Sequence, residues 1–101
     1  MTFIAYSNDN AIVLKNNNSV RIVKKLNVNY NSYSCIIALY DGRRFVKCVN
    51  IPASNGTTIL DETILCSDEY DEIKVMNWNN LSELVPLYEV EVIPSNDFIM
   101  E

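Results

Sequence analysis

Few residues of this 101-residue chain are suited to catalysis or metal binding. It contains no histidine, three cysteines and two glycines. The lack of histidine excludes the Ser-His-Asp and Cys-His relays and a histidine general base. Three thiols cannot supply the four ligands of an all-cysteine zinc site. The sequence therefore predicts a non-enzymatic protein without a metal ion or a cofactor.

The three cysteines, Cys35, Cys48 and Cys66, lie far apart and form no C-x-x-C pair. Cys35 and Cys48 stand inside apolar runs, which is typical of small buried hydrophobic residues. Because no histidine is present to activate a thiol, we expect three reduced cysteines. A reducing cytoplasm is then the expected place of synthesis.

An acidic stretch follows the middle of the chain. Its members are Asp61, Glu62, Asp68, Glu69, Asp71 and Glu72. A calcium loop would alternate carboxylates around a central glycine, and this stretch does not. It is therefore expected to be a solvated connection, with Asp61–Leu65 one of two places where a helical turn is predicted.

The net charge of −5 argues against a nucleic-acid partner, whose phosphates must be neutralised. Residues 1–50 carry seven of the eight basic residues, and residues 51–101 carry eleven of the thirteen acidic ones. Either strands from the two halves pair their charges, or the protein docks on a partner or on copies of itself electrostatically. No apolar run is long enough to span a bilayer and no signal peptide is recognised, so no membrane association is expected.

Alternating apolar residues predict a series of short strands bounded by Asn, Ser, Gly, Asp or Pro. The predicted strands are Thr2–Tyr6, Ala11–Lys15, Ser19–Val28, Ser34–Tyr40, Arg44–Ile51, Thr57–Leu60, Glu72–Trp78 and Leu87–Ile93. Asp41-Gly42 predicts a tight hairpin, and the asparagine clusters predict turns. This pattern is typical of a single all-β domain over residues 1–101, an immunoglobulin-like antiparallel β-sandwich of about seven strands.

The segment around the only tryptophan combines a strand, one helical turn at Asn80–Leu84 and a proline stop. Leu81 and Leu84 would face the same way at i, i+3. We expect this segment to plug one end of the sandwich. The predicted structural core residues are Trp78, Leu81, Leu84, Pro86 and Leu87.

These five residues form the pattern Trp-x-x-Leu-x-x-Leu-x-Pro-Leu after Ile73-Lys74-Val75. The segment resembles the C-terminal part of a small immunoglobulin-like β-sandwich module of Gram-positive surface proteins and of phage virion proteins. Asn77, Asn79 and Val85 depart from the apolar residue, aspartate and lysine that are usual there. The resemblance implies an accessory or structural role and brings no catalytic residue.

The favoured prediction is a phage virion structural protein, such as a capsid decoration, neck or tail accessory. Richness in Asn and Ile fits an AT-rich genome. Its expected partners are other virion proteins or copies of itself, in the virion after synthesis in the host cytoplasm. The alternatives are a small phage inhibitor of a bacterial defence system, for which the acidic charge is suited, and an excised accessory module of a cell-surface protein.

The tail over residues 94–101 carries three adjacent apolar residues, Phe98, Ile99 and Met100. In one interpretation they form a C-terminal arm that contacts a partner. In the other, they fold back as an edge strand or cover an open end of the sandwich.

Overall fold

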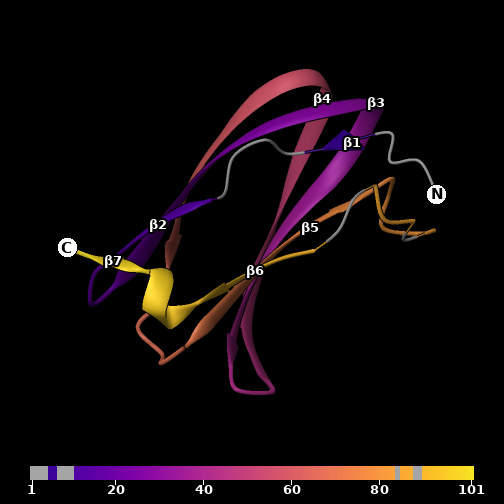
Figure 1. The fold of residues 1–101 in the computed structure, drawn as a ribbon. Helices are drawn as coiled ribbons and strands as arrows, with labels where there is room; N and C mark the ends of the chain where they lie inside the picture. Colours follow the sequence, from indigo (N-terminus) through magenta and orange to yellow (C-terminus); the bar gives the residue numbers. More distant parts are fainter. Residues whose placement is uncertain (1–4, 7–10, 84, 88–89) are drawn as a thin grey trace.

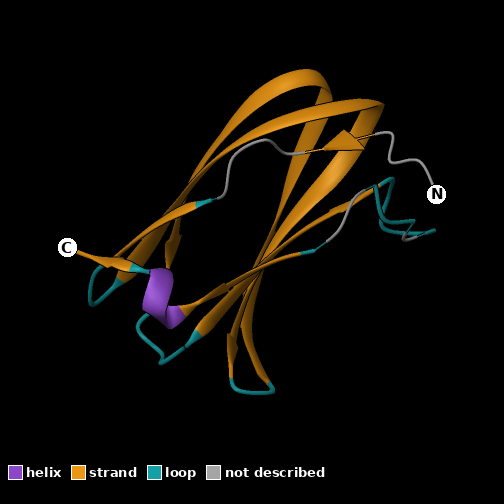
Figure 2. Cartoon of the chain, viewed as in Figure 1, coloured by secondary structure: helices purple, strands orange, loops and turns teal. Residues whose placement is uncertain are grey.

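The computed structural model describes residues 5–6, 11–83, 85–87 and 90–101, and most of these lie in β-strands (Figure 1, Figure 2). The elements are β1 (Ala5–Tyr6), β2 (Ile12–Lys15), β3 (Ser19–Asp41), β4 (Arg44–Leu65), β5 (Glu72–Trp78), β6 (Glu91–Pro94), the 3-10 turn η1 (Ser95–Asp97) and β7 (Ile99–Met100). The predicted all-β class is confirmed. Within the described residues, no helix has the length and hydropathy needed to span a membrane.

The centre of the fold is a long antiparallel hairpin of β3 and β4. Its register shifts between Val28 and Ser32, where β3 has extra residues opposite β4. Gly56 pairs with Val28 beside this irregularity and has a φ of +104°, which glycine adopts without the strain that a side chain would bring. Because a bulge bends the strands that carry it, the hairpin arches over, as Figure 1 shows.

The bend divides the hairpin into two layers. The first layer combines the first half of β3 and the second half of β4 with β1, β2 and β7. The second layer combines the remaining halves of β3 and β4 with β5 and β6. Between the layers lies the core, which includes Val13, Val20, Ile22, Leu26, Cys35, Ile37, Leu39, Ile73, Val75 and Ile93. The predicted β-sandwich is confirmed, and within the described residues its strands pair antiparallel except for the parallel pair of β2 and β7.

The two long strands correct four predicted boundaries. Ser19–Val28 and Ser34–Tyr40 belong to one continuous strand, and so do Arg44–Ile51 and Thr57–Leu60. Pairing resumes on the far side of the bulge, where Ser32 and Tyr33 pair with Ser54 and Ala53, so the chain stays extended and the turn preference of the polar residues is overridden. The helical turn predicted at Asp61–Leu65 is wrong, because these residues pair with β3 throughout.

The ends of the chain differ from the prediction in extent. Of the predicted strand Thr2–Tyr6, residues 2–4 lie outside the described residues, and Ala5–Tyr6 is a strand. The strand predicted over Leu87–Ile93 begins at Glu91 and ends at Pro94.

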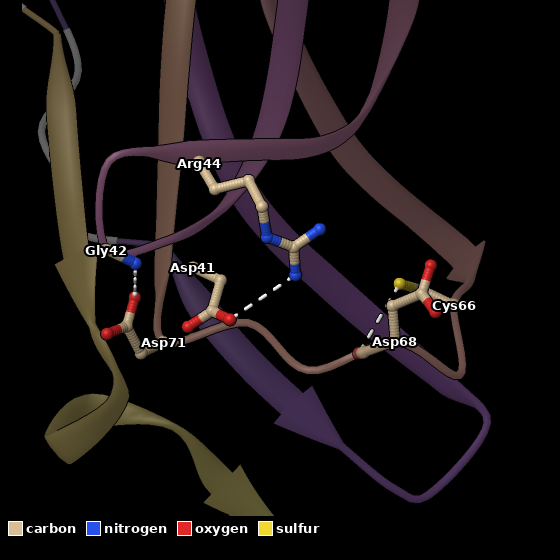
Figure 3. A network of polar contacts seen from close by, with 6 residues as sticks. All are labelled: Asp41, Gly42, Arg44, Cys66, Asp68 and Asp71. Atoms are coloured by element: carbon tan, nitrogen blue, oxygen red, sulfur yellow. Dashed lines mark hydrogen bonds and ion pairs between the residues drawn. The ribbon is translucent and has the colours of Figure 1, made fainter.

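Polar contacts hold the β3–β4 turn in place (Figure 3). The turn residues are Gly42, with a φ of +63°, and Arg43, so the predicted hairpin is confirmed with its turn one residue later. The backbone N–H of Gly42 donates to Asp71 Oδ1 at 2.9 Å, and Arg44 Nη2 lies 3.3 Å from Asp41 Oδ2. The tip of the hairpin is thereby tied to the residue that precedes β5.

The C-terminal tail folds back onto the first layer. Ile99 pairs in parallel with Leu14, and the N–H of Glu101 donates to the carbonyl oxygen of Lys15 at 2.8 Å. Phe98 is only 9% exposed, with its ring centroid 6.0 Å from that of Tyr70. The tail therefore follows the second interpretation, an edge strand that also closes the core.

Candidate protein-binding surface

The outer side of the second layer carries a group of aromatic and aliphatic side chains. In β5, Ile73 and Val75 are fully buried, so Lys74, Met76 and Trp78 point outward by strand alternation. Paired residues on neighbouring strands share a face, which extends this outer side across the layer. We call the following residues the second-layer face: Ile36, Tyr40, Phe45, Lys74, Met76, Trp78 and Val92.

Contacts within the second-layer face fix the direction of its side chains. The rings of Tyr40 and Phe45 meet edge to face, with centroids 5.8 Å apart. Lys74 Nζ lies 4.7 Å from the Tyr40 ring centroid and 3.9 Å from Glu72 Oε2. Phe45 and Val92 are 53% and 50% exposed. The face thus presents ordered apolar groups to solvent, with one lysine among them.

Trp78 belongs to this face and not to the core. It is half-buried and pairs with Ser34. The predicted plug is wrong for Trp78, because alternation puts the neighbouring Asn77 on the inner side, where it is 1% exposed. Ile73 and Val75 occupy alternate positions and mark the inner side of the strand. Trp78 lies an odd number of residues from both, so the same alternation assigns it to the outer side.

The turn after β5 is built from asparagine amides. Asn79 Oδ1 accepts hydrogen bonds from the N–H groups of Asn80 and Val85, at 2.8 and 3.0 Å. Asn80 Oδ1 accepts from the N–H groups of Ser82 and Glu83, at 2.9 and 2.7 Å. The predicted asparagine turn chemistry is confirmed for Asn79 and Asn80 and is wrong for Asn27, Asn29 and Asn31, which lie in β3. Residues 81–83 form a turn in place of the predicted helical turn.

The remaining predicted core residues of this segment have different environments. Leu87 is 2% exposed and belongs to the core, as predicted. Leu81 is 50% exposed and Pro86 is also exposed, so the prediction is wrong for both. The asparagine network closes the turn on itself and leaves these side chains outside the sandwich. Leu84 lies outside the described residues.

The three residues predicted to contact a partner also separate. Phe98 is buried, so it is a core residue and not an exposed contact. Ile99 and Met100 are 52% and 65% exposed on the edge strand β7.

The outer side of the first layer carries a bidentate ion pair. Arg21 Nε and Nη2 lie 2.7 and 2.6 Å from Asp61 Oδ1 and Oδ2. The hydrogen bond, with the opposite charge, raises the pKa of Arg21 and lowers the pKa of Asp61. The pair joins the basic and acidic halves of the chain, which confirms charge pairing between strands from the two halves.

A second ion pair lies inside the sandwich. The Lys24 side chain is 3% exposed, and its Nζ pairs with Glu91 Oε1. Glu91 Oε2 accepts a hydrogen bond from the N–H of Ala11 at 2.9 Å. Sequence reasoning missed Lys24 as an interior residue. The alternation of Ile22, Lys24 and Leu26 carries that signal.

The cysteines are free thiols in different environments. Burial raises the pKa of Cys35 to about 12, with a smaller opposing effect from the Lys24 charge. Cys66 is buried, whereas Cys48 is exposed. The prediction of a buried Cys48 is wrong, because its side chain lies on the outer side of β4, opposite Ala38. In the part of the chain that the structure describes, no group of three or more Cys, Asp or Glu side chains is placed to hold a metal ion.

Comparison with known proteins finds no matching family model, no matching curated protein and no matching solved structure. The second-layer face is therefore defined by geometry alone.

Proposed function

We propose that this protein is a non-enzymatic binding module that docks on another protein through the second-layer face. The observation that carries the proposal is the outward position of Trp78, Phe45 and Met76 on one side of the sheet. Aromatic residues dominate the binding energy of many protein interfaces, because they lose large apolar areas to a partner at little cost in side-chain entropy.

The proposed setting is a phage virion, with the protein as a capsid decoration, neck or tail accessory. The Trp78–Leu87 resemblance to immunoglobulin-like accessory modules and the Asn- and Ile-rich composition support this setting. The partner is then another virion protein. Lys74, at the centre of the second-layer face beside Glu72, would set the docking orientation through its charge.

Particles of the phage whose genome carries this sequence provide the test. The protein should co-purify with intact particles at a fixed stoichiometry. Particles that lack it should bind the added wild-type protein, and the Trp78→Ser and Phe45→Ser variants should bind at least tenfold more weakly, as expected for the loss of an interface anchor.

Ile59→Ser is the matched control, because Ile59 is 62% exposed on the outer side of the first layer. This variant should bind as the wild type does. Absence of the protein from purified particles would contradict the virion setting. Equal binding by all three variants would contradict the second-layer face.

A further inference from the structure

The interior of the sandwich brings together an amine, a carboxamide and a carboxylate. Lys24 extends from the first layer, and Asn77 and Glu91 belong to the second. Lys24 and Asn77 are 3% and 1% exposed. The side chain of Lys24 spans the interior, and its ammonium pairs with Glu91, the first residue of β6.

The strand register places Asn77 next to this ion pair. Glu91 pairs with Val75, and Asn77 lies two residues farther along β5 on the same inner face. Such diagonal neighbours lie about 7 Å apart, within reach of long side chains. Asn77 also pairs directly with Cys35, a residue on which the Lys24 charge acts. The three functional groups therefore occupy one region of the core.

We propose that Lys24 and Asn77 form an intramolecular isopeptide bond that joins the two layers, with Glu91 as the catalytic acid and base. This inference concerns the interior and is independent of the proposed binding function.

The reaction begins with transfer of a proton from the Lys24 ammonium to the Glu91 carboxylate. The neutral Nζ then attacks Asn77 Cγ and forms a tetrahedral intermediate. Glu91 gives its proton to the departing Nδ2 and takes one from Nζ, so the Cγ–Nδ2 bond breaks as the Nζ–Cγ bond is completed. Ammonia leaves, and the remaining proton stays on Glu91 until it exchanges with solvent. No oxidant, reductant or cofactor is consumed.

The fold favours these steps, because the sandwich holds the amine and the amide in one place and so replaces a bimolecular encounter by an intramolecular one. The carboxylate of Glu91 is 18% exposed, which gives protons and ammonia a route to solvent.

Intact mass spectrometry of the denatured full chain tests the proposal. The wild-type protein, after folding and incubation, should be lighter than its sequence mass by one molecule of ammonia. Digestion should yield one cross-linked peptide that joins the segments containing Lys24 and Asn77. A wild-type chain at its full sequence mass would overturn the proposal.

Variants separate this bond from other losses of ammonia. Lys24→Arg and Glu91→Gln should keep the full sequence mass, and Lys25→Arg should lose ammonia as the wild type does. Asn77→Asp should lose one molecule of water, because an aspartate side chain forms the same amide. A succinimide at Asn55-Gly56 would also release ammonia, but it would persist in Lys24→Arg and give no cross-linked peptide. Equal ammonia loss in the wild type and in Lys24→Arg would therefore refute the Lys24–Asn77 bond.

Discussion

The two layers of the sandwich have similar inner sides and different outer sides. Both bury an alternating row of aliphatic residues, for example Val20 and Ile22 in the first layer and Ile37 and Leu39 in the second. On the outer side, the first layer carries the Arg21–Asp61 ion pair and exposed aliphatic residues such as Ile59 and Leu65, whereas the second layer presents aromatic rings. Folding constrains the inner positions of both layers alike. The outer positions are free to differ, and their difference is therefore informative about binding.

The largest expected effect on stability is the difference between truncating an inner and an outer residue of the same strand. Ile37 is fully buried and its neighbour Ile36 is half-buried on the second-layer face. Ile37→Ala should lower the free energy of unfolding by about 2–5 kcal/mol, because it removes core contacts and leaves a cavity. Ile36→Ala should cost about 1 kcal/mol. Urea denaturation of both variants measures the difference, and equal losses would contradict the assignment of the two sides.

The bend that separates the layers is the next target. At Gly56, whose φ is +104°, a Cβ atom would meet nothing within 4 Å. Gly56→Ala should therefore cost about 1–3 kcal/mol through backbone strain alone. Gly42→Ala is the matched control, because a φ of +63° lies in the left-handed helical region and should cost about 1 kcal/mol. Thermal unfolding of the two variants tests this order, and a Gly56→Ala protein as stable as wild type would rule out strain at the bend.

The ion pair of the first layer should give a smaller, pH-dependent effect. Asp61 has a pKa below its usual 3.8 in the folded protein, so the pair stabilises the fold at neutral pH. That stability should be lost as the pH falls through the folded pKa. Melting temperatures of wild type and Asp61→Asn should therefore differ at neutral pH and converge in acid. A difference that persists in acid would show that the pair's charge is not its cause.

The smallest expected change in stability comes from alkylating Cys48, whose thiol lies on the outer side of the second layer. Iodoacetamide should modify Cys48 in the folded protein and should modify Cys35 only after unfolding, because burial keeps the Cys35 thiol protonated and inaccessible. Labelling of Cys48 should change the free energy of unfolding by less than about 0.5 kcal/mol. Peptide mapping identifies the labelled thiol, and rapid labelling of Cys35 in the native state would contradict the layer assignment.

The sequence predicts the all-β class and the Asp41-Gly42 hairpin, because alternation and turn chemistry are local signals. It does not predict that β3 and β4 continue through their polar middle sections. There the backbone conformation depends on pairing between residues distant in sequence and not on local turn preference. Trp78 illustrates a different limit. A lone tryptophan suggests a core residue, and only the parity set by Ile73 and Val75 assigns it to the outer side. The interior cluster of Lys24, Asn77 and Glu91 depends on three strands whose packing is not a local property.

The long β3–β4 hairpin also has a consequence for the order of folding. Its pairs range from Asp41 with Arg44, close in sequence, to Ser19 with Leu65, nearly half the chain apart. Short loops close at a lower entropic cost than long ones, so we expect the second-layer half of the hairpin to nucleate first. Truncation of Ile37 should then mainly slow folding, whereas truncation of Val20 should mainly speed unfolding. The second-layer half of the hairpin, which carries the aromatic outer side, would thus already be formed in the transition state for folding. The first layer would then pack against it.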